Sequence, residues 1–488
     1  AKEFFKRGNF LMAMEEYHKG LKIDRDKLSY NYNLGICYLM TNVNKPKAVT
    51  YLQRAYDNPK HDVDCPFFLG KAYMLNLDFK KAKKYLNEYI QKPGKRVGKA
   101  KLLLANCDDA VKLMETPINI SWENMGKYIN TEFPDYNPFV TQDEKVFLFT
   151  SRRESGKGNM EFDGYYPSDI YEVKFNGTNF TKAKNIGSVN TSLDEEIVGI
   201  YPDGSQMFVY LDHNLGRKDD PYGDIYMSYK KGSSWQKRQL LDYNELNTDH
   251  MEISASQSPD GNTIVFSSNR PGGKGGYDMY MLRKLPNGKW SAAQNIESLN
   301  TVGDESYPSF APDSKTLYFS SDGHKGMGGK DLYKVKWDPV KNTYGTPENL
   351  GYPLNTPDDE ETICFPVDYK HAYISASRPD GFGDLDIYRV TFNDVLLNPA
   401  LFITTIADET SGAPLKDGVL TVFNEHDDII GDFRPNKNSG VFTITLDPGV
   451  YTLEFELPDY PLKSVKWTVS EFDYKEGLIM KTVKLGKE

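Results

Sequence analysis

A motif that occurs five times, at intervals of 53 to 60 residues, constrains the fold of this chain more than any other feature. Each copy begins with Asn-Thr, has an Asp in a turn 13 residues after that Asn, and continues to an Asp-hydrophobic-Tyr segment. The three marks are Asn130, Asn190, Asn247, Asn300 and Asn355; Asp143, Asp203, Asp260, Asp313 and Asp368; and Asp169, Asp224, Asp278, Asp331 and Asp386. A repeat of this length indicates a propeller or an array.

Short runs rich in β-branched and aromatic residues lie between these marks and are separated by Gly, Pro and Asp. This pattern predicts four antiparallel strands per copy. Four-stranded copies placed radially form a β-propeller. Five complete copies predict an all-β five-bladed propeller over residues 116–396, with six blades as the alternative.

Ring closure is also readable from the sequence. Residues 117–126 resemble the last strand of a repeat, and the fifth copy lacks such a strand. We therefore expect a strand near residues 118–122 to complete the fifth blade, which would leave no open edge in the ring.

Residues 1–115 have the pattern of paired helices. Ala13, Ala48 and Ala82 are spaced 35 and 34 residues apart, and a large residue follows each after four positions. This spacing resembles the tetratricopeptide repeat, so we predict an all-α array of that type. Such an array either binds a peptide in its groove or packs against the propeller. The candidate groove residues are Tyr32, Asn33, Phe67 and Lys71.

Residues 399–488 alternate between apolar and polar side chains, which predicts a small antiparallel sandwich. The elements TSGAPL and GVFTITLDPGVYTLEF resemble the carboxypeptidase-regulatory-like domain, a transthyretin-like module. That resemblance implies a role in packing or docking and no catalytic residues.

A carboxylate stands five residues after each repeat Asn, and a basic residue stands 23 residues after it in most copies. Positions symmetric about a hairpin turn face each other, so we expect acid and base to pair in each blade. The Asp that begins the third strand is expected near the same Arg. We interpret this network as structural, with a cation-binding ring of carboxylates as the alternative. Its members are Asp135, Glu195, Glu252, Glu305, Glu360, Arg153, Arg270 and Arg378, with His213 and His324 as weaker bases.

The first two blades have long loops that carry aromatic residues. Unequal loops on a regular scaffold are common binding sites, and aromatic side chains anchor partners. The candidate partner-binding residues are Phe162, Tyr165, Tyr166 and Tyr222. The alternative is that these loops pack against the neighbouring domains.

The composition excludes several classes of protein. The net charge is −10, the mean hydropathy is −0.60, and no apolar run is long enough for a membrane helix. Because the chain is acidic and has no basic stripe, we expect no nucleic-acid partner. The Cys, His and carboxylate spacings match no metal or catalytic motif, so we predict no cofactor, no metal and no enzyme.

Taken together, these segments resemble the OmpA-family proteins of Bacteroidota that are associated with type IX secretion and gliding motility. The WD40-like repeats of the form S-S-x-R-P-G-G-x-G-G-x-D-x-Y and the order of the segments carry this resemblance. It implies a periplasmic location at the outer membrane and protein partners in a secretion complex. Members also carry an N-terminal lipid anchor and a C-terminal domain that binds peptidoglycan; we expect neither within these 488 residues, and whether they exist beyond the ends of this sequence stays open.

From the resemblance we predict a non-enzymatic scaffold or adaptor that links an outer-membrane or secretion assembly to the cell wall. The alternative is a module that binds a peptide or small ligand in the propeller channel. A degenerate hydrolase is the third hypothesis. It would need titratable groups that converge in the channel.

Overall fold

The computed structural model describes the chain apart from several short segments. The described residues are 1–92, 94–141, 144–155, 157–175, 180–201, 203–212, 223–241, 245–338, 341–366, 370–394, 400–436, 440–446, 448–470 and 478–487. Asp143, His213, Tyr222 and Asp368, which the sequence singled out, lie outside them.

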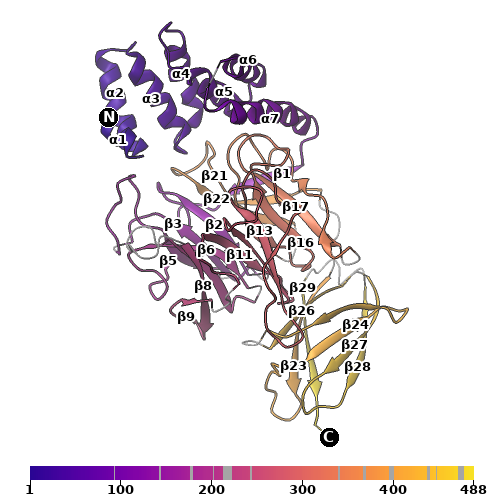
Figure 1. Ribbon diagram of the computed structural model, residues 1–488. Helices are drawn as coiled ribbons and strands as arrows, with labels where there is room; N and C mark the ends of the chain where they lie inside the picture. The colour runs from indigo at the N-terminus through magenta and orange to yellow at the C-terminus, as the bar shows by residue number, and fades with distance from the viewer. Residues whose placement is uncertain are drawn as a thin grey trace.

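Helices occupy residues 2–115 and form the indigo to purple part of the ribbon at the top of Figure 1. They are α1 (Lys2–Lys6), α2 (Phe10–Ile23), α3 (Leu28–Leu39), α4 (Ala48–Tyr56), α5 (Cys65–Leu75), α6 (Phe79–Ile90) and α7 (Val97–Glu115). The Asn9 and Asp78 side chains cap α2 and α6 by accepting a backbone N–H. None of the helices in the described part of the chain has the length and hydropathy needed to cross a membrane.

Close contact between neighbouring helices explains the small residues in this region. A Cβ atom added to Gly35 would lie 2.5 Å from Leu52 Cγ, and one added to Gly70 would lie 2.8 Å from Leu86 Cγ. Both distances are shorter than carbon atoms allow, so only glycine lets α3 approach α4 and α5 approach α6 this closely.

The prediction of an all-α tetratricopeptide array is wrong. The chain is mostly β, and its helices range from five residues in α1 to 19 in α7. A 3-10 turn at Lys45–Lys47 leads into the nine-residue α4. The spacing of Ala and Gly reflects close helix packing, which any pair of touching helices requires, and it does not specify that repeat family.

The centre of the chain folds into a β-propeller-like body, seen below the helices in Figure 1. Within the described residues it has five separate sheets, each with a four-strand path from the centre outward. The first sheet is β2 (Asp135–Val140), β3 (Val146–Ser151), β4 (Asp169–Lys174) and β5 (Lys184–Asn185); the second is β6 (Asp194–Ile200), β7 (Gln206–Asp212), β8 (Gly223–Lys231) and β10 (Gln239–Leu240), with β9 (Ser234–Trp235) beside β8.

The remaining three sheets follow the same plan. They are β11 (Glu252–Gln257), β12 (Thr263–Ser268), β13 (Asp278–Arg283) and β14 (Gln294–Asn295); β15 (Glu305–Phe310), β16 (Thr316–Ser321), β17 (Asp331–Asp338) and β19 (Glu348–Asn349), with β18 (Thr343–Tyr344) beside β17; and β20 (Ile363–Cys364), β21 (His371–Ala376), β22 (Asp386–Phe392) and β1 (Ile120–Asn124). The outer strand of this last sheet, β1, comes from the segment where the sequence placed a closing strand. It pairs with β22 along its whole length, from Ile120 opposite Phe392 to Asn124 opposite Tyr388.

The repeat Asn joins each blade to the one before it. In Asn300 the amide nitrogen donates to the Met279 carbonyl at 3.0 Å, and the amide oxygen accepts from the Met279 N–H at 2.7 Å. All five copies make this pair of bonds with the residue after the third-strand Asp. The pairs are Asn130 with Ile387, Asn190 with Ile170, Asn247 with Ile225, Asn300 with Met279, and Asn355 with Leu332.

The C-terminal strands form two facing sheets around a core that includes Phe402, Phe442, Phe455 and Trp467. The strands are β26 (Val441–Leu446), β23 (Ala400–Asp408) and β29 (Leu478–Leu485) in one sheet, and β25 (Ile429–Phe433), β24 (Val419–Phe423), β27 (Gly449–Glu456) and β28 (Lys463–Val469) in the other. This sandwich lies on the side of the propeller away from the helices (Figure 1).

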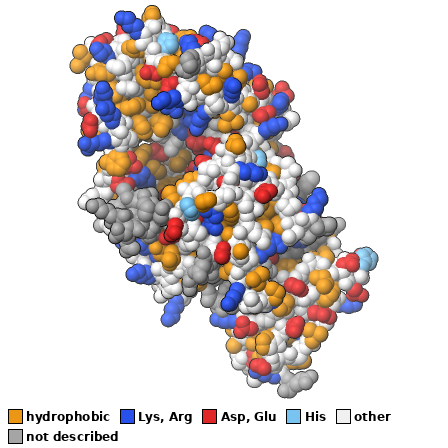
Figure 2. All heavy atoms as spheres, in the orientation of Figure 1, with side chains coloured by type: hydrophobic (Ala, Val, Ile, Leu, Met, Phe, Trp, Pro, Cys, Tyr) orange, Lys and Arg blue, Asp and Glu red, His pale blue; other side chains and the backbone are white. Residues whose placement is uncertain are grey.

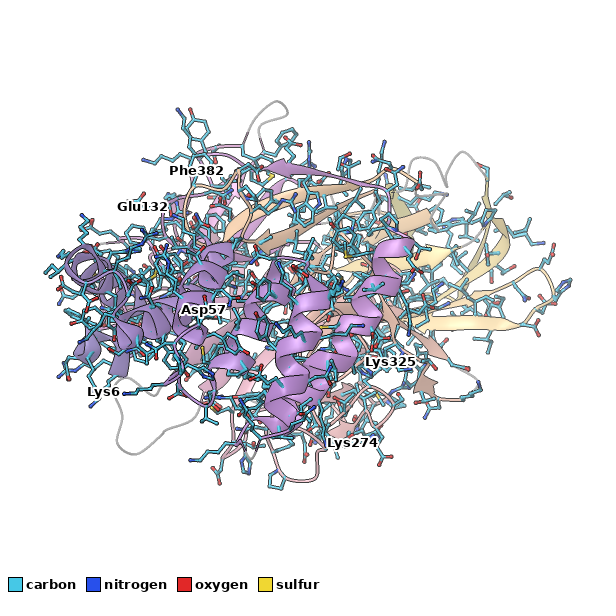
Figure 3. The ribbon with its side chains drawn as sticks, turned by 90° about the horizontal axis from the view of Figure 1, so that it is seen from above. Lys6, Asp57, Glu132, Lys274, Lys325 and Phe382 are labelled. Atoms are coloured by element: carbon cyan, nitrogen blue, oxygen red, sulfur yellow. The ribbon has the colours of Figure 1, made fainter. Side chains whose placement is uncertain are left out.

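The helical part packs onto one face of the propeller, as the view from above shows (Figure 3). Met327, from the loop before β17, is fully buried in the helical core. Lys45 Nζ lies 2.5 Å from Asp358 Oδ1, and the Asn42 amide donates to Asp384 at 2.7 Å. The two parts therefore share both an apolar and a polar contact.

We predict that Asn300→Ala lowers the free energy of unfolding of the propeller by about 2–4 kcal/mol, because it leaves a buried N–H and a buried carbonyl of Met279 without partners. Asn300→Asp keeps the acceptor and loses the donor, so it should also destabilise the propeller. Asn287→Ala, in an exposed turn, is the control and should change stability by less than about 0.5 kcal/mol. Urea unfolding measures all three. Equal stability of Asn300→Ala and Asn287→Ala would contradict the role given to the amide.

Candidate functional site

The carboxylate at the start of each innermost strand holds the Asn-Thr turn that precedes it. Glu305 accepts the Thr301 N–H at 2.8 Å and the Thr301 hydroxyl at 2.6 Å. The same two bonds occur in the other copies, at Asp135 with Thr131, Glu195 with Thr191, Glu252 with Thr248, and Glu360 with Thr356. This is why the repeat reads Asn-Thr followed by an acid.

An arginine pairs with this carboxylate in three blades. Arg153 bonds Asp135, and Arg270 bonds Glu252 with 3.0 Å between Nη2 and Oε1. In the second blade Arg238 lies 3.0 Å from Glu195, a partner that the sequence did not indicate. Each guanidinium also donates to the carbonyl of the residue before the repeat Asn, so it ties the turn to the blade.

The other two blades differ from the prediction. His324 does not pair with Glu305; its Nε2 lies 2.7 Å from the Leu299 carbonyl oxygen, the carbonyl at the position that arginine contacts elsewhere. Arg378 does not pair with Glu360; it lies 4.1 Å over the Trp122 ring and 3.9 Å from Asp380. Burial raises the pKa of Glu305 and, to a greater extent, that of Glu360.

A β-bulge accounts for one residue of the two-residue error in register, and the turn accounts for the other, because Val140 stands opposite Phe147 and not Leu148. Asp135 stands opposite Ser151 in the β2–β3 pair, and Glu305 stands opposite Ser321 in the β15–β16 pair. In the first blade the base, Arg153, therefore lies two residues beyond Ser151, the residue that faces the acid. A base at this position contacts the acid only where an arginine side chain is long enough to reach it. A bulge inserts one residue on one strand, which a count symmetric about the turn does not detect.

The third-strand Asp was expected beside the Arg and instead closes the glycine-rich loop. Asp278 accepts the N–H groups of Lys274 and Gly275, and Asp331 accepts that of Met327. Burial raises the pKa of Asp331 to about 7 and that of Asp386 to about 6. The predicted set of two carboxylates and one base is therefore two separate groups in each blade. One is the carboxylate that holds the Asn-Thr turn, and the other is the third-strand Asp with the glycine-rich loop.

A second set of polar side chains meets at the propeller axis. It consists of Tyr136, Glu196, Ser306, Tyr307, Lys330 and Glu361, which we call the channel cluster. Tyr136 donates to Glu196 at 2.7 Å, across β2 and β6. Lys330 Nζ lies 3.0 Å from Ser306 Oγ and 3.0 Å from Glu361 Oε1. Because these groups come from four blades, they can meet only near the centre of the ring.

The environment of Glu196 is unusual for a carboxylate. Burial raises the pKa of Glu196 to about 7; the Tyr136 hydrogen bond opposes this shift, and Asp194 and Glu361 add to it. Arg152, whose charge lowers the pKa of Glu196, donates to Glu161 at 2.5 Å and to Asp163 at 2.7 Å. A carboxyl with a pKa near 7 can hold or release a proton at neutral pH, or bind a cation that keeps it ionised.

Sequence reasoning did not find the channel cluster, although one signal was available. Tyr136, Glu196, Ser306 and Glu361 all stand one residue after the fixed carboxylate. In a strand, neighbouring residues point in opposite directions, so this position faces the axis when the fixed acid faces the turn. The position varies between copies, whereas the repeat is recognised by the residues that all copies share.

The long loop of the first blade makes internal contacts. The Tyr165 hydroxyl donates to Asp384 at 2.5 Å, and the Asn9 amide donates to the Phe162 carbonyl at 2.6 Å. The Tyr166 ring lies 5.7 Å from that of Phe133. Of these candidate anchors, Phe162 keeps 65% of its surface exposed, while Tyr165 joins the loop to another blade.

The candidate groove residues of the helical part also have partners. The Tyr32 hydroxyl donates to Asp62 at 3.2 Å, the Asn33 amide donates to the Tyr17 hydroxyl at 2.9 Å, and Phe67 is buried. Burial lowers the pKa of Lys71, and Asp359 of the propeller partly offsets the shift. Lys71 therefore faces the propeller, and these four residues do not form one open surface.

A groove of about 690 Å³ lies at the junction of the helices and the propeller. We call it the junction groove; its apolar lining is Val43, Pro46, Leu75, Leu77, Tyr352, Pro353, Pro357, Pro379 and Phe382. Figure 2 shows the near face of the molecule hollowed between these two parts, and Figure 3 shows Phe382 beside Glu132 on the side that faces away in Figure 2. Val43, Leu77 and Phe382 are exposed to solvent by 36%, 40% and 48%. The other side chains of the lining are polar: Asn42, Asn44, Lys45, Thr356, Asp358, Ser377 and Arg378. The groove is therefore a mixed surface in which apolar side chains are open to solvent.

Comparison with known proteins gives distant likenesses only. No protein-family profile matches the chain, and no curated protein matches its sequence. A solved structure described as a glycoside hydrolase is 8% identical, with a TM-score of 0.38 over 59% of this chain and 95% of the other. A thermostable family-43 glycoside hydrolase is 11% identical, with a TM-score of 0.34 over 55% and 93%. The tricorn protease is 12% identical, with a TM-score of 0.33 over 72% and 33%.

These likenesses overturn the prediction that the chain is not an enzyme. Glycoside hydrolases and a protease are among the similar structures, so a propeller-like fold is no evidence against catalysis, and that prediction is not carried further. At TM-scores below 0.5 they assign no activity to this chain either. Within the described residues no group of three or more His, Cys, Asp or Glu is placed to hold a metal ion.

We predict that Glu196→Gln stabilises the protein more at high pH than at low pH. The folded-state pKa of Glu196 is raised from 4.5 to about 7, so ionisation costs folding free energy as the pH rises from 4.5 to 7. The gain from the substitution should grow through this window to at most about 3 kcal/mol. Glu348→Gln, at a side chain that is 70% exposed, is the control and should show no such trend. A gain for Glu196→Gln that does not depend on pH would show that its carboxylate is not destabilised.

Proposed function

We propose that the chain is a periplasmic scaffold that binds protein partners of an outer-membrane or type IX secretion assembly and links it to the cell wall. The repeat motif and the C-terminal sandwich support this proposal through their resemblance to OmpA-family proteins of Bacteroidota, and in particular to the secretion-associated lipoprotein PorE. The resemblance assigns the peptidoglycan contact to a domain outside these 488 residues. The proposal for this chain therefore concerns protein contacts.

The junction groove is the observation that carries the proposal. Exposed apolar side chains from two parts of the chain converge there beside polar ones, and protein–protein interfaces combine apolar and polar groups in this way. Much of its apolar lining is Pro or Tyr, which offer rigid apolar faces at low entropic cost. The groove suits an extended apolar segment of a partner protein that inserts side chains between Leu77 and Phe382.

The fixed contacts around the groove make it a preformed surface. Lys45 and Asp358 form an ion pair at one wall, and the Ser377 hydroxyl donates to the Asn42 carbonyl at 2.8 Å. These bonds hold the turn before α4 against the loops of the last two blades. A partner would not have to order the groove before binding, which favours affinity.

The test is affinity capture from detergent-solubilised envelopes, followed by binding measurements with each purified partner. The groove variant combines Val43→Ser, Leu77→Asn and Phe382→Ser; Asn suits the positive φ of 58° at Leu77. The matched control combines Val302→Ser, Ile429→Ser and Leu462→Ser, which are 89%, 64% and 63% exposed away from the groove.

We expect the wild type and the control to recover the same secretion or outer-membrane proteins, and the groove variant to bind them at least tenfold more weakly. The loss of three apolar contacts supplies this reduction, since a tenfold change needs only about 1.4 kcal/mol. Equal affinity of the groove variant and the wild type would contradict the groove as the contact. Recovery of no such protein by the wild type would contradict the scaffold proposal itself.

A further inference from the structure

One half of the channel cluster already binds an ammonium group that belongs to the protein itself. Lys330 Nζ lies 3.0 Å from the Glu361 carboxylate, 3.0 Å from the Ser306 hydroxyl and 5.4 Å from the centre of the Tyr307 ring. A carboxylate, a hydroxyl and an aromatic face together are a favourable environment for a cation. The axis of the propeller can therefore hold an organic cation.

The other half has the same types of group and no cation of its own. Glu196 accepts from the Tyr136 hydroxyl at 2.7 Å and from the Asn137 amide at 3.4 Å. Arg152, the cation whose charge acts on Glu196, is held by the Glu161 and Asp163 carboxylates and by the Tyr166 carbonyl. The described residues thus leave the Glu196 carboxylate with neutral donors only.

Backbone strain at two positions turns side chains toward this centre. Asn137 and Tyr307 have φ angles of 51° and 52°, and both lie at bulges of innermost strands. A residue other than glycine is strained in this region, and such strain is retained where the surrounding structure requires the geometry. Here it brings the Asn137 amide to Glu196 and the Tyr307 ring over Lys330.

We propose that the channel cluster binds a ligand through an organic cation, a primary ammonium or guanidinium group, held by Glu196 and Tyr136 on the side of the axis opposite Lys330 and Glu361. The site takes an organic cation and not a metal ion, because its donors are one carboxylate, a phenol and an amide. It lies at the axis, apart from the junction groove at the edge, so either site can exist without the other.

Binding of a cation at this place has a defined pH dependence. Glu196 must be ionised to hold the ligand. The groups around it are Tyr136 on β2, Arg152 after β3, Asp194 on β6, Tyr210 on β7, Tyr307 on β15, Lys330 before β17 and Glu361 before β20. Burial acts to lower the pKa of Lys330, but the Glu361, Asp359 and Asp304 carboxylates together raise it, so Lys330 stays charged through neutral pH. With the pKa of Glu196 at about 7, affinity should rise about tenfold from pH 6 to pH 8.

Calorimetry on the full chain tests the site with three probes: Nα-acetyl-lysine methylamide, the same compound acetylated on its side chain, and the free diamine cadaverine. We expect the two amines to bind and the acetylated probe not to bind. Glu196→Gln should weaken amine binding at least tenfold and Tyr136→Phe about threefold, while Glu348→Gln should leave it unchanged. Tighter binding of the lysine compound would indicate a basic side chain of a peptide as the source, and tighter binding of cadaverine would indicate a free amine.

Three outcomes would overturn the proposal. They are equal binding of the charged and acetylated lysine compounds, binding by Glu196→Gln that equals that of the wild type, and no binding of either amine by the wild type. Because Gln has nearly the shape of Glu, a folded Glu196→Gln protein with an unchanged unfolding transition at pH 5 makes the comparison valid. Affinity that does not change between pH 6 and pH 8 would exclude Glu196 as the group that holds the cation.

Discussion

The propeller depends on one interaction that is repeated around the ring: the side-chain amide of the repeat Asn bonds both backbone groups of a residue in the preceding blade. A side-chain amide has a separate N–H donor and C=O acceptor, as a peptide group does, so it can take the place of a neighbouring strand at a buried position. The carboxylate five residues later fixes the Thr beside the Asn, and in three blades an arginine fixes that carboxylate. The most constant residues of the repeat are thus those that join blade to blade.

The residue that follows the fixed carboxylate in each innermost strand takes no part in these bonds between blades. That position carries Tyr136, Glu196, Ser306 and Glu361, and it faces the axis, where side chains of four blades converge. The residues shared by all copies hold the blades together, and the variable position supplies the polar side chains at the axis. The helical part packs on one face of the propeller: Lys45 and Asn42 bond its loops, and Met327 of the propeller is buried among the helices. The junction groove lies at the edge of this contact.

Much of the propeller-like fold could be predicted, because the repeat marks are local and the turn residues have fixed geometry. The pairing of acids and bases could be predicted only in part: Arg153 and Arg270 reach their carboxylates, whereas Arg378 lies against Trp122. The tetratricopeptide prediction was wrong, because Gly35 and Gly70 report close helix contact and not a repeat family. The channel cluster was missed because its residues come from different blades and meet only after the ring forms.

Hydrogen exchange at the five amides bonded to a repeat Asn tests the closed ring most directly. These amides belong to Ile170, Ile225, Met279, Leu332 and Ile387. Ile387 is the decisive one, since its partner Asn130 comes from the other end of the propeller sequence. If the ring is closed, the Ile387 amide exchanges as slowly as that of Met279, through unfolding of the whole propeller. Exchange at Ile387 that is much faster than at Met279 would show that the ring opens between its first and last blades and would contradict this account.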